Sequence, residues 1–133
     1  MPSSSKRQAD KDFLEGLRVL VVEDAWHVAK ALKAALESVG MHVSGPAATT
    51  ADARRLVAEH MPRLAVVDVN LKHEMASGLI EELHDQGVSV VVVSGYAFPP
   101  VSVDKAAAFL QEPFSGTELL AALRRVVAQA RIH

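Results

Sequence analysis

The sequence predicts an α/β domain built on a doubly wound, five-stranded parallel sheet. Three short, valine-rich runs lack polar alternation, which is typical of strands buried on both faces. They lie at about 18–23, 63–68 and 88–94. Segments with helical spacing of apolar residues separate the runs, so right-handed crossovers between parallel strands are expected.

The composition fits one globular domain and excludes several classes of function. Half of the 133 residues are hydrophobic, which is enough to bury a core. The formal net charge is −2 and no basic stripe is present, so nucleic acid is not an expected partner. Because the chain has no cysteine, disulfide and thiolate chemistry are excluded. No apolar stretch is long enough to span a bilayer and no secretory signal is present, so we expect a cytoplasmic protein with no membrane partner.

The N-terminal residues differ from the rest of the chain. Residues 1–17 are polar, with charges that cancel. This composition predicts a flexible extension in front of a domain of residues 18–133, with at most a short helical piece near Phe13 and Leu14.

The first half of the domain alternates strand and helix. A helix follows the first strand and is expected to stop at Gly40. A short second strand then leads into a turn at Gly45-Pro46. Thr49 or Thr50 is expected to cap the second helix, because their hydroxyls can accept hydrogen bonds from its first N–H groups.

The second half is less regular. A third helix spans about 77–86 and precedes the strand at 88–94. Pro99-Pro100 cannot lie inside a helix, which predicts a short or irregular fourth helix, of a turn or two, over about 102–107. The fifth strand follows at 107–110. The last helix begins with the capping box Ser115-Gly-Thr-Glu118.

Polar side chains stand where the buried strands end. Glu23 and Asp24 follow the first strand, Asp68 ends the third and Ser94 ends the fourth. Because the carboxyl ends of parallel strands share one edge, these side chains should crowd a crevice of the kind where open α/β sheets bind ligands. Taken singly, each acidic residue could instead be structural, and Asp24 could be only the N-cap of the helix that follows.

This group of oxygen ligands predicts magnesium and phosphoryl chemistry. Mg²⁺ prefers oxygen ligands, so Asp24 and Asp68 are candidate direct ligands and Glu23 could hold a coordinated water. The backbone carbonyl of Asn70 is a further candidate. An aspartate beside a cation can accept a phosphoryl group covalently. Ser94 could then hydrogen-bond to that group, and the adjacent glycine, Gly95, would leave room for it.

These residues, in this order and approximate spacing, resemble the receiver domain of two-component response regulators. The resemblance covers about residues 18–130 and is carried by Glu23-Asp24, Asp68, Ser94 and Glu112-Pro113-Phe114. It implies a flavodoxin-like (βα)5 fold with Asp68 as the phosphoacceptor. It also implies Mg²⁺ at the acidic pair, Ser94 as the switch hydroxyl and Phe109 as the aromatic switch residue. It further implies that the protein is not an enzyme: at most it transfers a phosphoryl group to itself and then dephosphorylates itself.

Two stretches resemble one subgroup of receivers in particular. Val93-Ser-Gly-Tyr96, with the prolines after it, and Phe109-Leu-Gln-Glu-Pro-Phe114 are similar to the single-domain group named for a Phe-Ala-Thr-Gly-x-Tyr signature, the FATGUY group. This resemblance implies a histidine kinase, often of the HWE type, or a phosphotransfer protein as the phosphodonor. It also implies a downstream protein partner and a homodimer face on the fifth strand and the last helix.

One position departs from the family pattern. Receivers have a lysine before the proline that follows the fifth strand, and here that residue is Glu112. Two like charges about 4 Å apart repel by roughly 4 kcal/mol at an effective dielectric constant near 20. The alternative function is therefore a pseudo-receiver that binds partners without being phosphorylated. Glu112 could instead face solvent, and Lys72 or Lys105 could replace the missing charge. The Glu112–Pro113 bond is a candidate cis peptide, as in the family.

Overall fold

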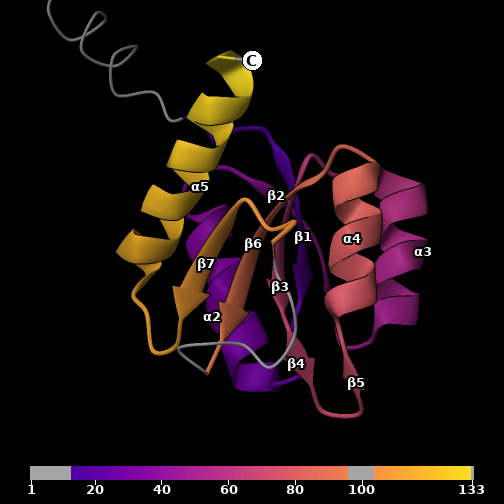
Figure 1. Ribbon diagram of the computed structural model, residues 1–133. Coiled ribbons are helices and arrows are strands. Elements are labelled where there is room, and N and C mark those ends of the chain that lie inside the picture. The colour runs from indigo at the N-terminus through magenta and orange to yellow at the C-terminus, as the bar shows by residue number, and fades with distance from the viewer. Residues whose placement is uncertain (1–12, 96–103, 133) are drawn as a thin grey trace, which may run out of the picture.

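A computed structural model describes residues 13–95 and 104–132 of the chain. Five parallel strands form a central sheet in the order β2-β1-β3-β6-β7 (Figure 1). The strands are β1 (Arg18–Val22), β2 (His42–Ala47), β3 (Leu64–Asp68), β6 (Ser89–Ser94) and β7 (Ala108–Gln111). This sheet confirms the predicted doubly wound fold.

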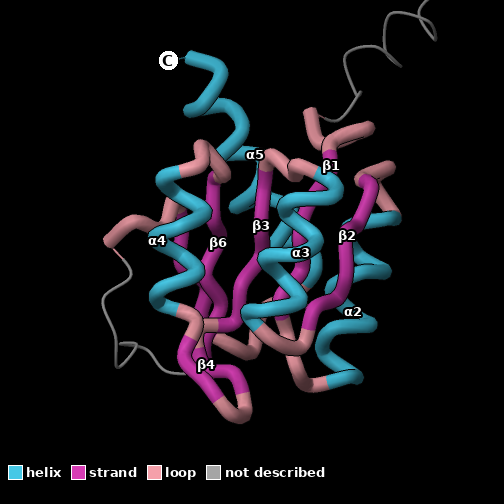
Figure 2. Tube along the Cα trace, turned by 90° about the vertical axis from the view of Figure 1, so that its right-hand side faces the viewer, coloured by secondary structure: helices cyan, strands magenta, loops and turns pink. Residues whose placement is uncertain are grey.

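Helices cover both faces of the sheet (Figure 2). On one face lie α2 (Trp26–Glu37) and α5 (Gly116–Ile132), and on the other lie α3 (Thr50–His60) and α4 (Ser77–Asp85). Successive strand residues point to opposite faces, so each face has its own apolar core. Val19 and Val21 belong to the core under α2 and α5, whereas Leu20 and Val22 belong to the core under α3 and α4.

Two predicted helix caps are confirmed. The Thr49 hydroxyl accepts a hydrogen bond from the Asp52 N–H at 3.1 Å, at the start of α3. At the start of α5, the Glu118 N–H donates to the Ser115 hydroxyl at 3.0 Å, and the Ser115 N–H donates to the Glu118 carboxylate at 3.1 Å. These bonds satisfy N–H groups that the first turn of a helix leaves without partners.

A small hairpin follows β3 and was not predicted. Its strands are β4 (Asn70–Leu71) and β5 (Glu74–Met75), which pair antiparallel. The turn between them consists of Lys72 and His73. Strands this short contain too few residues for an alternating pattern to reveal them. The hairpin projects from the carboxyl edge of the sheet (Figure 1).

The prediction of a turn at Gly45-Pro46 is wrong. β2 runs through both residues to Ala47, and its register against β1 shifts between Leu20 and Val22. Proline is tolerated there because β2 is an edge strand with an irregular register, where a missing N–H need not break the ladder. The Gly45–Pro46 peptide bond is cis.

Part of the predicted N-terminal extension packs against the domain. Leu14 is fully buried in the core under α2 and α5, and the Gly16 N–H donates to the Gly40 carbonyl at 2.8 Å. Residues 13–16 form a turn where a short helical piece was expected. The rest of the extension lies outside the described residues.

The segment before β7 is only partly described. Pro99-Pro100 and the start of the expected fourth helix lie outside the described residues. The residues just before β7 form a turn and a bend. Within the described ranges, no helix is long and apolar enough to cross a membrane.

Candidate metal centre

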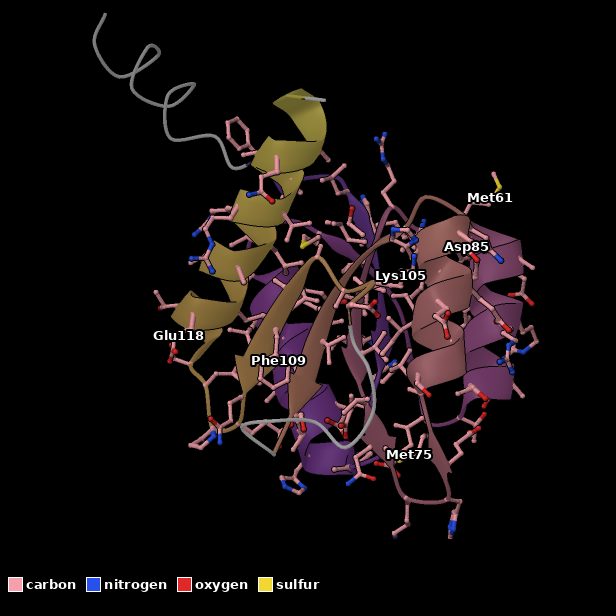
Figure 3. All side chains as sticks on the ribbon, viewed as in Figure 1. Met61, Met75, Asp85, Lys105, Phe109 and Glu118 are labelled. Carbon is pink, nitrogen blue, oxygen red and sulfur yellow. The ribbon has the colours of Figure 1, made fainter. Side chains whose placement is uncertain are left out.

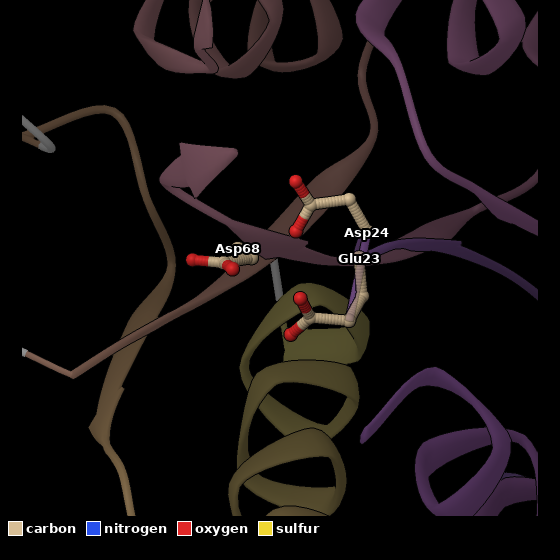
Figure 4. A group of neighbouring side chains, drawn as sticks. All are labelled: Glu23, Asp24 and Asp68. Carbon is tan, nitrogen blue, oxygen red and sulfur yellow. The ribbon is translucent and has the colours of Figure 1, made fainter. Parts of the chain in front are cut away.

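Three carboxylates meet at the carboxyl edge of the sheet (Figure 4). Glu23 and Asp24 follow β1 and Asp68 ends β3, and one ligand atom from each lies within 4.8 Å of the others. The pairing of β1 with β3, in which Val22 lies opposite Val67, brings these positions side by side. A compact set of carboxylate oxygens suits a hard divalent cation such as Mg²⁺.

Backbone N–H groups orient two of these carboxylates. The Ala25 N–H donates to Glu23 Oε2 at 3.1 Å, and the Asn70 N–H donates to Asp68 Oδ1 at 3.0 Å. Each carboxylate therefore keeps one oxygen that these bonds do not occupy. Such outer hydrogen bonds hold metal ligands in place before the metal arrives.

Asp24 is held by the hairpin and does not cap α2. The N-cap of α2 is Ala25, which makes no side-chain capping bond. The Asp24 carboxylate instead accepts a hydrogen bond from the Lys72 N–H in the hairpin turn. Asp24 is therefore not the N-cap of α2, and its partner, Lys72, lies far from it in the sequence.

Burial and mutual repulsion disturb the titration of the site. Glu23 is 3% exposed, and its burial raises its pKa to about 8, with smaller contributions from Asp68 and Glu112. Burial also raises the pKa of Asp68, assisted by the charge of Asp24 and opposed by the Asn70 N–H. Desolvation and like charge both favour the neutral form of a carboxyl group. Burial therefore favours the protonated form of Glu23 over its charged form.

A fourth carboxylate belongs to the same electrostatic environment. Glu112 is partly buried, and its burial, followed by the charge of Asp68, raises its pKa. The Glu112 N–H donates to the Ser94 carbonyl at 2.7 Å, which ties it to the end of β6. The Glu112–Pro113 peptide bond is cis. Glu112 therefore adds negative charge beside Asp68 and is only partly exposed to solvent.

The other candidate residues lie at different depths. Ser94 is fully buried at the end of β6, and Gly95 after it is exposed. Phe109 is partly buried on β7 and packs against the core under α3 and α4 (Figure 3). Lys105 precedes the amino end of β7, at the edge of the sheet opposite Met75 and the metal centre (Figure 3). Along the sheet, Lys105 is therefore separated from the carboxylates by most of the length of β7.

Sequence reasoning missed an apolar groove that Glu112 helps to line. It encloses about 540 Å³ between α2 and the start of α5. Gly95 and Glu112 line it together with Ala31, Ala35 and Leu119. The lining residues come from three separate stretches of the chain, so no local pattern could have revealed the groove.

One protein family and several solved structures are similar to this chain. The family model "Response regulator receiver domain" matches residues 19–124. A CheY-like receiver domain protein from Methanospirillum hungatei has a TM-score of 0.75 at 23% identity, over 86% of this chain and 96% of that chain. CheY4 of Vibrio cholerae has a TM-score of 0.73 at 20% identity, over 84% of this chain and 98% of that chain.

The response regulator PhyR from Brucella abortus is also similar. Its TM-score is 0.80 at 19% identity, covering 97% of this chain and 54% of that chain. The chain thus spans about half the length of that protein. At identities this low, the structural likeness shows the fold alone. No match was found among curated protein sequences.

Proposed function

Because the chain belongs to the family of response regulator receiver domains, we propose that it accepts a phosphoryl group on Asp68 in a Mg²⁺-dependent phosphorelay. The observation that carries this proposal is the convergence of Glu23, Asp24 and Asp68, with ligand atoms within 4.8 Å of one another. These residues, with the Asn70 carbonyl, would hold the cation. The bound cation supplies positive charge that lets a carboxylate approach an anionic phosphoryl donor.

The chain's own groups have separate tasks in this reaction. One Asp68 oxygen accepts the Asn70 N–H at 3.0 Å, which leaves the other oxygen for the metal or the phosphorus. An Asp68 oxygen forms the new P–O bond while the P–N bond of a phosphohistidine breaks, and the imidazole takes the electron pair. Ser94 then donates its hydroxyl to a phosphoryl oxygen, Gly95 leaves room for that oxygen, and Phe109 changes position as the switch residue.

The proposed partners follow from the family resemblance. The phosphodonor is a histidine kinase, of the HWE type if the FATGUY resemblance holds, or a phosphotransfer protein. The output is binding to another protein in the cytoplasm, and β7 with α5 is the proposed face for a second copy of the chain. No turnover of an outside substrate is proposed.

A pseudo-receiver is the second candidate function. The observation that favours it is Glu112, which is partly buried and close enough to Asp68 for their charges to interact. A carboxylate at that position repels a phosphoryl group where a lysine would attract it. In that case the domain would bind partners independently of phosphorylation.

Phosphorylation measured by intact mass separates these two functions. The protein is incubated with Mg²⁺ and acetyl phosphate, beside the variants Asp68→Asn and Glu112→Lys. Gain of one phosphoryl group by the natural chain, absent from Asp68→Asn, is the expected result. An adduct on Glu112→Lys alone would establish the pseudo-receiver, with Glu112 as its cause. No adduct on either protein, also with a kinase as donor, would refute phosphorylation of this domain.

A further inference from the structure

The β4–β5 hairpin is fastened directly to the metal centre. The Asn70 N–H donates to Asp68 at 3.0 Å, and two residues later the Lys72 N–H donates to Asp24. The backbone that enters the hairpin turn therefore lies against two of the three carboxylates. This places the Cα of Lys72, and the origin of its side chain, beside the site.

The outgoing strand of the hairpin is anchored to α3. The Glu74 carboxylate accepts the Thr50 N–H at 2.9 Å and the Thr50 hydroxyl at 2.6 Å. Arg54 donates to the same hydroxyl oxygen at 3.3 Å and is itself paired with Glu82 at 2.7 Å. The turn is thus held on both sides, by the carboxylates before it and by α3 after it. Its backbone has a defined position, which a loop tip with no such anchors would lack.

The charge of Lys72 is available at this position. Its side chain is exposed, and none of the ion pairs found among residues 13–95 and 104–132 includes it. Lys30 is also close in sequence to the acidic pair, but its ammonium lies 5.0 Å from the centre of the Trp26 ring. Lys105 precedes the amino end of β7, whereas the carboxylates follow the carboxyl ends of β1 and β3. Among Lys30, Lys72 and Lys105, Lys72 is therefore the lysine best placed to reach a group on Asp68.

We propose that Lys72 supplies the ammonium that balances the phosphoryl group on Asp68, in place of the lysine that Glu112 replaces. The proposal rests on the proposed phosphorylation of Asp68. A lysine carries a compact charge on a flexible four-carbon stem, long enough to pass from the backbone beside Asp24 to a phosphoryl group on the neighbouring Asp68. Its three N–H donors can bond to phosphoryl oxygens with charge assistance.

The first test compares three lysine variants. Lys72→Met keeps the length of the side chain and the backbone N–H to Asp24 but removes the charge. We expect its phosphorylation by acetyl phosphate to slow by roughly fivefold, the upper end for an exposed ion pair. Lys72→Arg should retain most of the rate. Lys105→Met, which removes a lysine at the far edge, is the matched control and should leave the rate unchanged.

Mg²⁺ affinity separates lost charge from a damaged hairpin. Removing a positive charge near a cation site tightens Mg²⁺ binding slightly, so Lys72→Met should bind Mg²⁺ at least as well as the natural chain. A disordered hairpin would instead release Asp24 and weaken Mg²⁺ binding. Slower phosphorylation with undiminished Mg²⁺ affinity is the signature of a charge that acts on the phosphoryl group.

The Glu112→Lys background completes the test. With a lysine restored at position 112, loss of the Lys72 charge should matter much less, so Lys72→Met should slow phosphorylation by under about twofold. Equal rates for Lys72→Met and the natural chain would overturn the role of Lys72 while leaving phosphorylation of Asp68 intact. A natural chain that takes no phosphoryl group at all would overturn both, since Lys72 would then fail to compensate for Glu112.

Discussion

Thr50 donates two hydrogen bonds to the carboxylate of Glu74, one from its N–H at 2.9 Å and one from its hydroxyl at 2.6 Å. The two residues lie at the N-terminus of α3 and on the outgoing strand of the hairpin. A negative charge is favoured at a helix N-terminus, where N–H groups have no partners within the helix. This pair therefore couples the position of the hairpin, and with it the bond from Lys72 to Asp24, to α3.

The Glu74 anchor should weaken in acid. Its bonds from the Thr50 hydroxyl and N–H, then the charge of Arg54, lower its pKa below the ordinary 4.5. The unfolded chain therefore binds a proton more tightly, and the stabilisation is present above pH 4.5 and lost as the pH falls through the lower, folded pKa. Urea unfolding should show a smaller loss of stability between about pH 5 and pH 3 for Glu74→Gln than for the natural chain.

The matched control for this pH effect is Glu59→Gln. Glu59 is an exposed acidic residue at the other end of α3, paired with Arg55 at 3.3 Å and not with the hairpin. Glu59→Gln should lose about as much stability between about pH 5 and pH 3 as the natural chain does. Equal pH profiles for Glu74→Gln and the natural chain would contradict the coupling.

Mg²⁺ should be detectable through Trp26. It is the chain's single tryptophan, stands two residues after Asp24 and is 73% exposed. Titration with Mg²⁺ should give a saturable fluorescence change that EDTA reverses. Asp24→Asn should weaken the affinity at least about tenfold, since even groups that only orient a metal ligand have effects of that size.

The control for the Mg²⁺ titration is Asp52→Asn. Asp52 is an exposed aspartate on α3, with an oxygen 3.7 Å from Arg55, and it is not one of the three carboxylates of the metal centre. Its replacement should not alter the titration. The absence of a saturable change, together with no shift of Tm by Mg²⁺ in calorimetry, would argue against a metal at this edge.

Removing the charge of Glu112 should stabilise the metal-free protein and weaken its binding of Mg²⁺. Glu112→Gln takes away a partly buried carboxylate beside Asp68, so the protein in EDTA should gain about 0.5 kcal/mol, a value reduced for partial exposure. The same change removes attraction for a cation and should weaken Mg²⁺ binding. Urea unfolding and calorimetric titration measure the two effects, with the exposed Glu37→Gln as control. If the Glu112 side chain faced solvent, Glu112→Gln would change neither the free energy of unfolding nor the Mg²⁺ affinity.

Leu14 should contribute to stability although it lies in the polar N-terminal segment. Its side chain is fully buried in the core under α2 and α5. Leu14→Ala should reduce the free energy of unfolding by about 2–4 kcal/mol, through lost burial and the cavity left behind. Phe13→Ala, at a neighbour that is 54% exposed, should change it by under about 1 kcal/mol. Similar losses for both variants would contradict this packing.

Much of the fold and of the acidic edge could be predicted from local patterns. Unbroken valine runs identify strands buried on both faces, and the rule that parallel strands end at one edge brings together the residues that follow them. Asp68 stands out because a carboxylate at the end of a buried apolar strand is costly unless it is paired or binds a cation. The caps at Thr49 and Ser115 are likewise visible because a cap is built from residues a few positions apart.

Local patterns in the chain suffice to predict which carboxylates gather at one edge of the sheet. They also show that Glu112 stands where the family has a lysine. The partial burial of Glu112, the place of Lys72 beside the site and the packing of Leu14 in the core depend on contacts across the folded chain. The position of the hairpin also depends on such contacts, because the bonds that hold it join Lys72 to Asp24 and Glu74 to Thr50. Those partners are 48 and 24 residues apart, so their energies depend on the whole fold and leave no local pattern in the chain.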